Sequence, residues 1–135
     1  VAALALGAHG VWMGTRFIAT EEARGHINYK NKITEIDEDG TTITRANSGK
    51  TARIIKNSFT EYWKQNEEKI KPFPAQLREI GLQASIAGRM EGDIDNGVLA
   101  AGQSSGLIES VKPAGDVISD IVKQAEEVLS HLRNA

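Results

Sequence analysis

The chain has 135 residues and a net charge of −2, so it carries no excess of basic residues of the kind that binds nucleic acid. Hydrophobic residues make up 40% of it and charged residues 25%, which is typical of a globular domain, and its longest apolar run, Val1–Leu6, is too short to span a bilayer. It contains no cysteine, which excludes disulfides and thiolate metal sites and fits an expected cytoplasmic location.

The first twenty residues have the pattern of one layer of an α/β fold. Val1–Leu6 is apolar and helix-forming, and Gly7 stands where a left-handed cap ends a helix. Val11–Met13 is a short apolar run, predicted to be a buried strand that ends at Gly14. Thr20 is placed to cap a following helix. Because no cap precedes Val1–Leu6, we expect this helix to be cut from a longer protein.

A different pattern begins near residue 33. Asp39-Gly40 is a hairpin signal between Ile33–Asp37 and Thr41–Arg45, and Thr51–Ile55 is predicted to be a strand that follows a second turn at Ser48-Gly49.

Two helical patterns follow. An amphipathic helix is predicted to place a set of large residues in the core and to end at a Pro-Phe-Pro break; the set is Phe59, Tyr62, Trp63 and Ile70. Short helices are expected around Leu77–Ala87, then an acidic loop at Glu91–Gly97. From Pro113 a final helix carries an apolar packing stripe between Val117 and Leu132.

These patterns divide the chain into three expected parts. Residues 1–20 and 99–135 have the patterns of pieces of one α/β layer, and residues 21–98 have the pattern of a small α+β insertion between them. The fold class predicted is therefore α/β.

The end of the predicted strand at Gly14-Thr15 is a candidate phosphate site. A glycine exposes backbone N–H groups and a threonine adds a hydroxyl donor, and barrel phosphate sites commonly follow strands 7 and 8. The alternative, which spacing alone favours, is that Gly14 only lets the chain bend.

Other motifs are incomplete. Gly49-Lys50-Thr51 lacks the second glycine of a P-loop, because Thr44 stands at that position, and we interpret it as a hairpin turn. The acidic loop beginning at Asp93 lacks the closing glutamate of a calcium loop. The three histidines, His9, His26 and His131, have no metal-ligand spacing, and His26 is expected at the surface.

The residues themselves carry a family resemblance. Residues 3–23, which include Gly14-Thr15-Arg16-Phe17, closely resemble the segment around the last barrel strand of nitronate monooxygenases, formerly called 2-nitropropane dioxygenases. Later blocks are similar in the same order: Tyr29-Lys30, Arg53–Trp63, Pro72–Gln76, Gly92-Asp93, Ala101–Gln103 and Gly106–Ile108. The resemblance covers essentially the whole chain.

This resemblance implies a fold, a cofactor and a set of site residues. The fold is the C-terminal fragment of an FMN-binding (β/α)8 TIM barrel with a small α+β insertion domain. In that barrel, residues 1–20 would be the last helix and strand, 21–98 the inserted domain on the substrate side, and 99–135 the C-terminal helices. The FMN phosphate site would include Trp12, Met13, Gly14 and Thr15, and Gln103 would lie near the flavin. Many members have Gln where this chain has Trp12. Catalytic residues are expected upstream of this chain, which alone would be incomplete and inactive.

The implied activity is oxidation of alkyl nitronates by FMN and molecular oxygen. The partners are then a small nitronate and oxygen, with no nucleic acid, membrane or metal. One alternative is a flavin-dependent enoyl-[acyl-carrier-protein] reductase, which shares the fold and similar Gly-Thr and Ala-Gly-Gln blocks. Another is a non-catalytic fragment or binding module.

Overall fold

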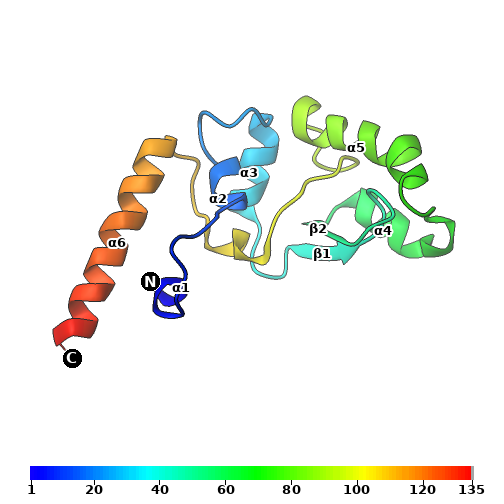
Figure 1. Ribbon diagram of the computed structural model, residues 1–135. Helices are drawn as coiled ribbons and strands as arrows, with labels where there is room; N and C mark the ends of the chain where they lie inside the picture. The colour runs from blue at the N-terminus through cyan, green and yellow to red at the C-terminus, as the bar shows by residue number, and fades with distance from the viewer. Residues whose placement is uncertain (135) are drawn as a thin grey trace.

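The computed structural model describes residues 1–134, which form an elongated molecule with a small β-hairpin at one end and a long helix at the other (Figure 1). The regular helices are α1 (Ala2–Ala5), α2 (Thr15–Ile18), α3 (Ile27–Glu35), α4 (Ser58–Gln65), α5 (Leu82–Ile86) and α6 (Ala114–Asn134). The strands are β1 (Thr41–Thr44) and β2 (Ala52–Ile55). Short 3-10 turns are η1 (Glu67–Lys69) and η4 (Gln103–Leu107), and η2 (Leu77–Gly81) and η3 (Ala87–Glu91) are π-helical.

The core consists of two apolar clusters that share strand β2. Successive side chains of a strand point to opposite faces, and so Ile54 packs in one cluster and its neighbour Ile55 in the other. Val98 and Leu99 divide in the same way. The cluster of Ile54 contains Ala46, Phe59, Trp63 and Val98. The cluster of Ile55 contains Ala19, Tyr29, Ile33, Leu99, Ala101 and Ile108.

The β-hairpin forms at the second predicted turn and not at the first. Strands β1 and β2 pair antiparallel, with Thr41 opposite Ile55, and the turn at Ser48-Gly49 lies in the connection. Gly49 has φ +83°, and a Cβ there would lie 2.5 Å from the backbone nitrogen of Phe73. The predicted strand Ile33–Asp37 is wrong, because residues up to Glu35 continue α3 and Ile33 lies in the core.

Two helix boundaries also differ from the sequence prediction. Thr20 caps no helix: its backbone forms a parallel bridge with Lys112, and its hydroxyl donates to the carbonyl of Phe17. Helix α3 begins at Ile27 instead, where the ring of His26 accepts the N–H of Asn28, so His26 is partly buried and not at the open surface.

Helix α4 is held at its first turn by a capping box. The side chain of Asn57 accepts the N–H of Thr60, and the hydroxyl of Thr60 accepts the N–H of Asn57. The predicted burial of Trp63 is confirmed, but Tyr62 is 55% exposed, and the helix ends at Gln65, well before the Pro-Phe-Pro break.

The predicted helices at Leu77–Ala87 are confirmed as one continuous stretch, η2, α5 and η3. Two glycines let the stretch approach other backbone closely. A Cβ at Gly81 would meet the carbonyl of Asn47, and a Cβ at Gly88 would lie 2.8 Å from the carbonyl oxygen of Val98. Substitution of either glycine would therefore push these segments apart.

The terminal helices are confirmed, but their apolar faces are mostly uncovered. Gly7 has φ +94° and ends α1, with the N–H of Ala8 bonded to the carbonyl of Ala3 at 3.0 Å. Helix α6 stands to one side of the body in Figure 1. Of its predicted packing stripe only Val117 is buried, whereas Leu132 is 65% exposed.

The predicted buried strand at Val11–Met13 is wrong for this chain. The segment forms no strand, Val11 is 52% exposed and Trp12 is fully exposed. A strand requires neighbours that complete its hydrogen bonds, and no strand among residues 1–134 lies beside this segment.

Candidate functional site

The candidate site is centred on Gly14 and Thr15, where the extended N-terminal segment turns into α2. The backbone N–H groups of Gly14 and Thr15 donate to no acceptor within residues 1–134. A Cβ on Gly14 would meet no atom of residues 1–134 within 4 Å, so the space at the side-chain position of Gly14 is open. Unpaired N–H groups facing open space can receive an anion.

A hydrogen bond links this point to the second motif block. The N–H of Gly102 donates to Oγ1 of Thr15 at 2.9 Å, which places η4, and Gln103 at its first position, next to α2. Because Oγ1 serves here as the acceptor, the Thr15 hydroxyl keeps its own proton for another partner. The structure thus brings together Gly14, Thr15 and the exposed Gln103.

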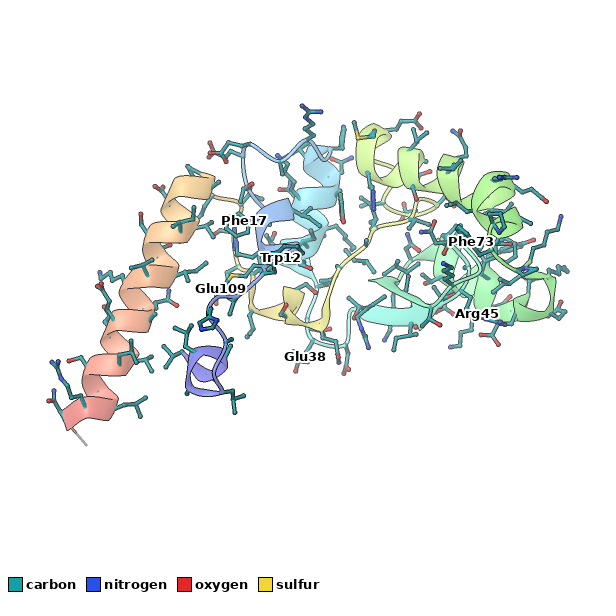
Figure 2. The ribbon with its side chains drawn as sticks, viewed as in Figure 1. Trp12, Phe17, Glu38, Arg45, Phe73 and Glu109 are labelled. Atoms are coloured by element: carbon teal, nitrogen blue, oxygen red, sulfur yellow. The ribbon has the colours of Figure 1, made fainter. Side chains whose placement is uncertain are left out.

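The other two site residues lie on the approach to α2. Trp12 is fully exposed and Met13 is 38% exposed, and neither packs in a core cluster. Figure 2 labels Trp12 on the thin segment that joins α1 to the body. Their predicted role at a phosphate site stays a prediction.

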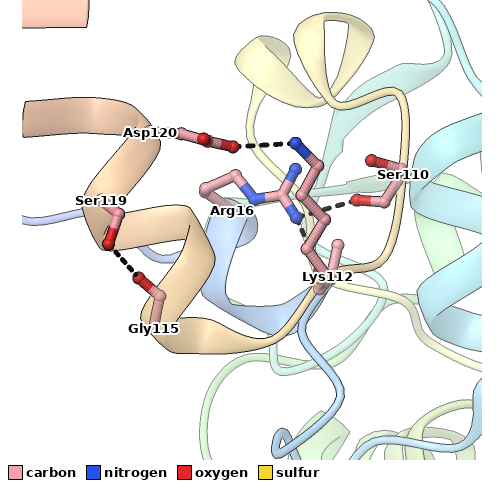
Figure 3. A network of polar contacts seen from close by, with 7 residues as sticks. Arg16, Ser110, Lys112, Gly115, Ser119 and Asp120 are labelled. Atoms are coloured by element: carbon pink, nitrogen blue, oxygen red, sulfur yellow. Dashed lines mark hydrogen bonds and ion pairs between the residues drawn. The ribbon is translucent and has the colours of Figure 1, made fainter. Parts of the chain in front are cut away.

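Arg16 fastens the same turn to the C-terminal part of the chain (Figure 3). Its Nη2 donates to the carbonyls of Ala19 at 2.7 Å and Ser110 at 2.8 Å. Beside it, Lys112 pairs with Asp120 of α6 at 2.8 Å, which lowers the pKa of Asp120. The guanidinium is therefore bonded to two backbone carbonyls and has a structural role here.

A mainly apolar cleft of about 430 Å³ begins at Gly14. Its lining comes from α2, the loop before α3, α3 itself, η3 and the chain before η4: Gly14, Phe17, Ile18, Ala23, Arg24, Gly25, Tyr29, Arg89, Met90 and Ala100. The volume lies in the range of small-molecule sites.

Tyr29 forms part of the cleft wall and is 97% buried. Its hydroxyl donates to the carbonyl of Ala100, and burial raises the pKa of Tyr29 to about 12, an effect that the nearby charge of Arg89 opposes. With its proton bonded and its pKa raised, the phenol serves as a wall rather than as an acid or base.

The segments that resemble a P-loop and a calcium loop both have structural explanations that involve no ligand. Gly49-Lys50-Thr51 lies between the hairpin strands, and the ammonium of Lys50 lies 4.3 Å from the ring centre of Phe73. The carboxylate of Asp93 accepts the N–H groups of Asn96 and Asp95, which lowers the pKa of Asp93. Within residues 1–134 no three His, Asp or Glu side chains are grouped to hold a metal ion.

Sequence reasoning missed most of the cleft and the partner of Thr15. Gly102 lies 87 residues from Thr15, and Arg89 and Met90 lie between the predicted helices at Leu77–Ala87 and the predicted loop at Glu91–Gly97, where the sequence analysis made no prediction. A contact over such a distance leaves no local sequence signal, although the two motif blocks quoted from the family contain both of its ends.

In residues 1–134 no helix is both long and apolar enough to cross a membrane.

The comparison with protein families gives one match that covers most of the chain. The family model described as "Nitronate monooxygenase" matches residues 1–124. A "Probable nitronate monooxygenase" of Staphylococcus saprophyticus is 32% identical over 96% of this chain and 36% of its own length. A protein of the same description from Staphylococcus aureus is 32% identical over 97% of this chain. The chain thus spans about a third of these relatives.

Solved structures resemble the chain over nearly its full length. FabK from Thermotoga maritima superposes with a TM-score of 0.84 at 38% identity, covering 98% of this chain and 42% of that one. Nitroalkane oxidase from Streptomyces ansochromogenes superposes with a TM-score of 0.82 at 27% identity, covering 97% and 37%. The α/β architecture expected from the sequence fits part of the fold of these two proteins.

Proposed function

Because the chain belongs to the nitronate monooxygenase family, we propose that it forms part of an enzyme that oxidises alkyl nitronates with FMN and molecular oxygen. The proposal concerns the whole enzyme, since the chain spans about a third of the length of its relatives. We further propose a cytoplasmic location and the three-part organisation 1–20, 21–98 and 99–135, with the middle part on the substrate side of a barrel.

The residues around Gly14 fit the phosphate of FMN. Two N–H groups without partners, the free proton of the Thr15 hydroxyl and the open space at Gly14 together provide donors and room for an anion. The hydrogen bond from Gly102 to Thr15 is the observation that carries the proposal, because it joins the Gly-Thr and Ala-Gly-Gln blocks at one place.

In this proposal the chain binds and orients, and FMN, when bound, supplies the redox chemistry. Gly14 and Thr15 hold the phosphate, and Trp12 and Met13 contribute to the same site through the approaching backbone. Gln103 lies on the flavin side. The cleft beside Gly14 excludes water from the apolar part of the substrate. In this proposal no residue of this chain takes part in the chemical step itself.

The enoyl-[acyl-carrier-protein] reductase alternative stays open as a second candidate. The identity to FabK, 38%, is higher than the 27% to nitroalkane oxidase, which gives this alternative some support. The curated relatives named as nitronate monooxygenases favour the first candidate. Turnover of a nitronate without a nicotinamide cofactor would decide for the first, and dependence on a nicotinamide cofactor would decide for the second.

A substitution at Gly14 tests the phosphate site directly. Since a Cβ there meets no atom of residues 1–134, Gly14→Val should leave the free energy of unfolding of this chain within about 0.5 kcal/mol of the wild type. It should weaken FMN binding about 10- to 100-fold, because the side chain fills the place of the phosphate and removes charge-assisted hydrogen bonds. Fluorescence titration of the apoprotein with FMN measures this.

The matched control is Lys50→Ala, in the hairpin turn that resembles a P-loop. It should leave FMN affinity unchanged. If Lys50→Ala weakens FMN binding and Gly14→Val does not, the phosphate site lies elsewhere and the assignment to Gly14 and Thr15 fails.

A further inference from the structure

Helix α2 begins at the candidate site and is only one turn long. A helix of this length has little stability of its own, so contacts outside the helix determine where it lies. Two such contacts come from consecutive residues. Oγ1 of Thr15 accepts the N–H of Gly102 at 2.9 Å, and Nη2 of Arg16 donates to the carbonyl of Ser110 at 2.8 Å (Figure 3).

These two contacts lie at the two ends of η4. Gly102 immediately precedes η4, and Ser110 lies shortly after it. The hydroxyl of Ser105 donates to the carbonyl of Gly102 at 2.7 Å, and a Cβ on Gly106 would lie 2.6 Å from the backbone nitrogen of Glu38. Because η4 is itself packed closely on the body, the two contacts attach α2 to a fixed support.

A single nitrogen of Arg16 closes this arrangement. Nη2 donates also to the carbonyl of Ala19, the residue that ends α2, at 2.7 Å. The same atom therefore holds the end of α2 against the chain that follows η4. Since Thr15 lies in the same turn, a rotation of α2 that moves Thr15 away from Gly102 would also strain the bonds of Nη2.

The stability of the fold alone does not account for a guanidinium at this position. Within residues 1–134, Nε of Arg16 is buried without an acceptor, and no carboxylate forms an ion pair with the side chain. A buried donor without a partner destabilises the folded state, and an apolar side chain can often replace a buried charge without loss. The planar guanidinium is suited instead to holding two carbonyls in fixed positions.

We propose that Arg16 is a positioning residue for the phosphate site. By holding α2 between Ala19 and Ser110, it keeps Oγ1 of Thr15 within reach of Gly102 and leaves the hydroxyl proton of Thr15 for the phosphate. This inference rests on the proposed function and goes beyond it, because Arg16 acts through Thr15 and does not itself contact the phosphate.

The ratio of the affinities for FMN and riboflavin measures what the phosphate contributes to binding. Arg16→Ala in the complete enzyme should lower this ratio about 3- to 30-fold, and by no more than Thr15→Val does, since one hydrogen bond to a charged group is affected. Arg16→Lys keeps the positive charge but not the planar group, so it should lower the ratio as well. Fluorescence titration of the apoprotein with each ligand measures the ratio.

The matched control is Arg53→Ala. Arg53 of β2 is also a partly buried arginine, and its Nη1 donates to the hydroxyl of Thr41 at 3.0 Å within the hairpin. Its replacement removes a hydrogen bond far along the chain from α2 and should leave the ratio unchanged. If Arg53→Ala lowers the ratio as much as Arg16→Ala, a loss of stability alone weakens binding and the inference is overturned.

A double-mutant cycle decides whether Arg16 acts through Thr15. If it does, Arg16→Ala added to Thr15→Val should not lower the ratio further. If Arg16→Ala lowers the ratio by the same factor in both backgrounds, or if Arg16→Lys keeps the wild-type ratio, the charge of the guanidinium acts on the phosphate directly and the positioning role is wrong.

Hydrogen exchange of the apoprotein gives a readout that needs no ligand. Arg16→Ala should speed the exchange of the Gly102 N–H, which bonds to Thr15, and should not change that of Ile55, which donates to the carbonyl of Leu99. Where Arg16→Ala does not fold, Arg16→Gln, which retains part of the side-chain stem, is measured in its place. An unchanged rate at Gly102 overturns the inference.

The outcomes separate this inference from the proposed function. If the wild-type enzyme binds FMN and riboflavin equally well, the phosphate site itself fails, and this inference fails with it. If the wild type prefers FMN and Arg16→Ala keeps that preference in full, the phosphate site stands and only the role of Arg16 is wrong.

Discussion

The backbone N–H of Gly102 lies 2.9 Å from Oγ1 of Thr15, and 87 residues separate the two in the chain. This contact fixes the rotation of the Thr15 side chain, since the oxygen must face Gly102. The hydroxyl proton is then free for another acceptor, and we propose that the phosphate of FMN accepts it.

The first prediction concerns the two functions of that hydroxyl. Thr15→Val keeps the shape of the side chain but neither accepts the N–H of Gly102 nor donates to a phosphate. We expect a loss of about 1–3 kcal/mol in the free energy of unfolding, and a further weakening of FMN binding by about 10- to 100-fold. Thr15→Ser should retain most of both. Urea unfolding and FMN titration measure the two effects.

Riboflavin, which lacks the phosphate, is the control ligand for this prediction. Thr15→Val should reduce the affinity for riboflavin much less than the affinity for FMN. An equal reduction for both ligands would mean that Thr15 acts only through Gly102, and the phosphate contact would be wrong.

The second prediction is a loss of stability at alkaline pH through Tyr29. Its pKa is raised from 10.0 to about 12, mainly by burial, so the folded state favours the protonated phenol. The resulting stabilisation, about 2–3 kcal/mol, is fully present below pH 10 and is lost as the pH rises from about 10 to about 12. Urea unfolding at a series of pH values should show this decline.

Tyr29→Phe should flatten the decline, because phenylalanine has no proton to lose. The variant should be less stable at neutral pH by about 0.5–1.5 kcal/mol, since the carbonyl of Ala100 loses its donor. Tyr62→Phe, on the exposed face of α4, is the control and should keep the wild-type profile. An unchanged decline in Tyr29→Phe would refute the assignment.

The third prediction concerns Gln76, which is 99% buried. Its Nε2 donates to the carbonyl of Ala46 at 2.7 Å, and its Oε1 accepts the N–H of Lys71 at 3.1 Å. Gln76→Leu has a similar volume but leaves the buried carbonyl of Ala46 and the partly buried N–H of Lys71 without these partners, so we expect about 2–4 kcal/mol of destabilisation. Thermal or urea unfolding measures it, and Gln83→Leu on the exposed side of α5 should change stability by less than about 0.5 kcal/mol.

The fourth prediction concerns residues 1–135 expressed alone. Leu6, Trp12 and Leu132 are 90%, 103% and 65% exposed, which leaves apolar surface open at α1, at the segment before α2 and along α6. We expect this polypeptide to self-associate and to bind FMN only weakly. Light scattering after gel filtration should show species larger than a monomer, and the combined change Leu129→Gln and Leu132→Gln should reduce them. A clean monomer with micromolar FMN binding would contradict both expectations.

The sequence correctly predicted those elements whose conformation depends mainly on residues close together in the chain. The apolar spacing after Pro113 predicted α6, and the positive φ of Gly7 follows from its position after an apolar helical run. The hairpin at Ser48-Gly49 was also predictable, because residues suited to a turn separate two short β-forming segments.

The errors arose where distant contacts override local preference. Thr20 has the character of a helix cap, but its backbone pairs with Lys112, and so α3 starts seven residues later, at Ile27. The apolar residues after Ile33 are as compatible with a helix as with a strand, and burial of Ile33 beside Ile55 decides for the helix. The site residues from Trp12 to Thr15 and Gln103 came from a family resemblance, because their spacing alone does not identify a phosphate site.

The pairing of Thr20 with Lys112 also bears on how the length of this chain can vary. The backbone bridge, together with the carboxylate of Glu22 at the N–H of Ala114, brings the two ends of the intervening segment side by side. When the ends of a segment are held together, lengthening a loop within it adds little to the entropic cost of closing that loop. Doubling the number of residues in a loop adds only about 0.6 kcal/mol. Insertions in the exposed connections of this segment should thus be tolerated during evolution, as long as Gly102 and Ser110, which bond Thr15 and Arg16, keep their places.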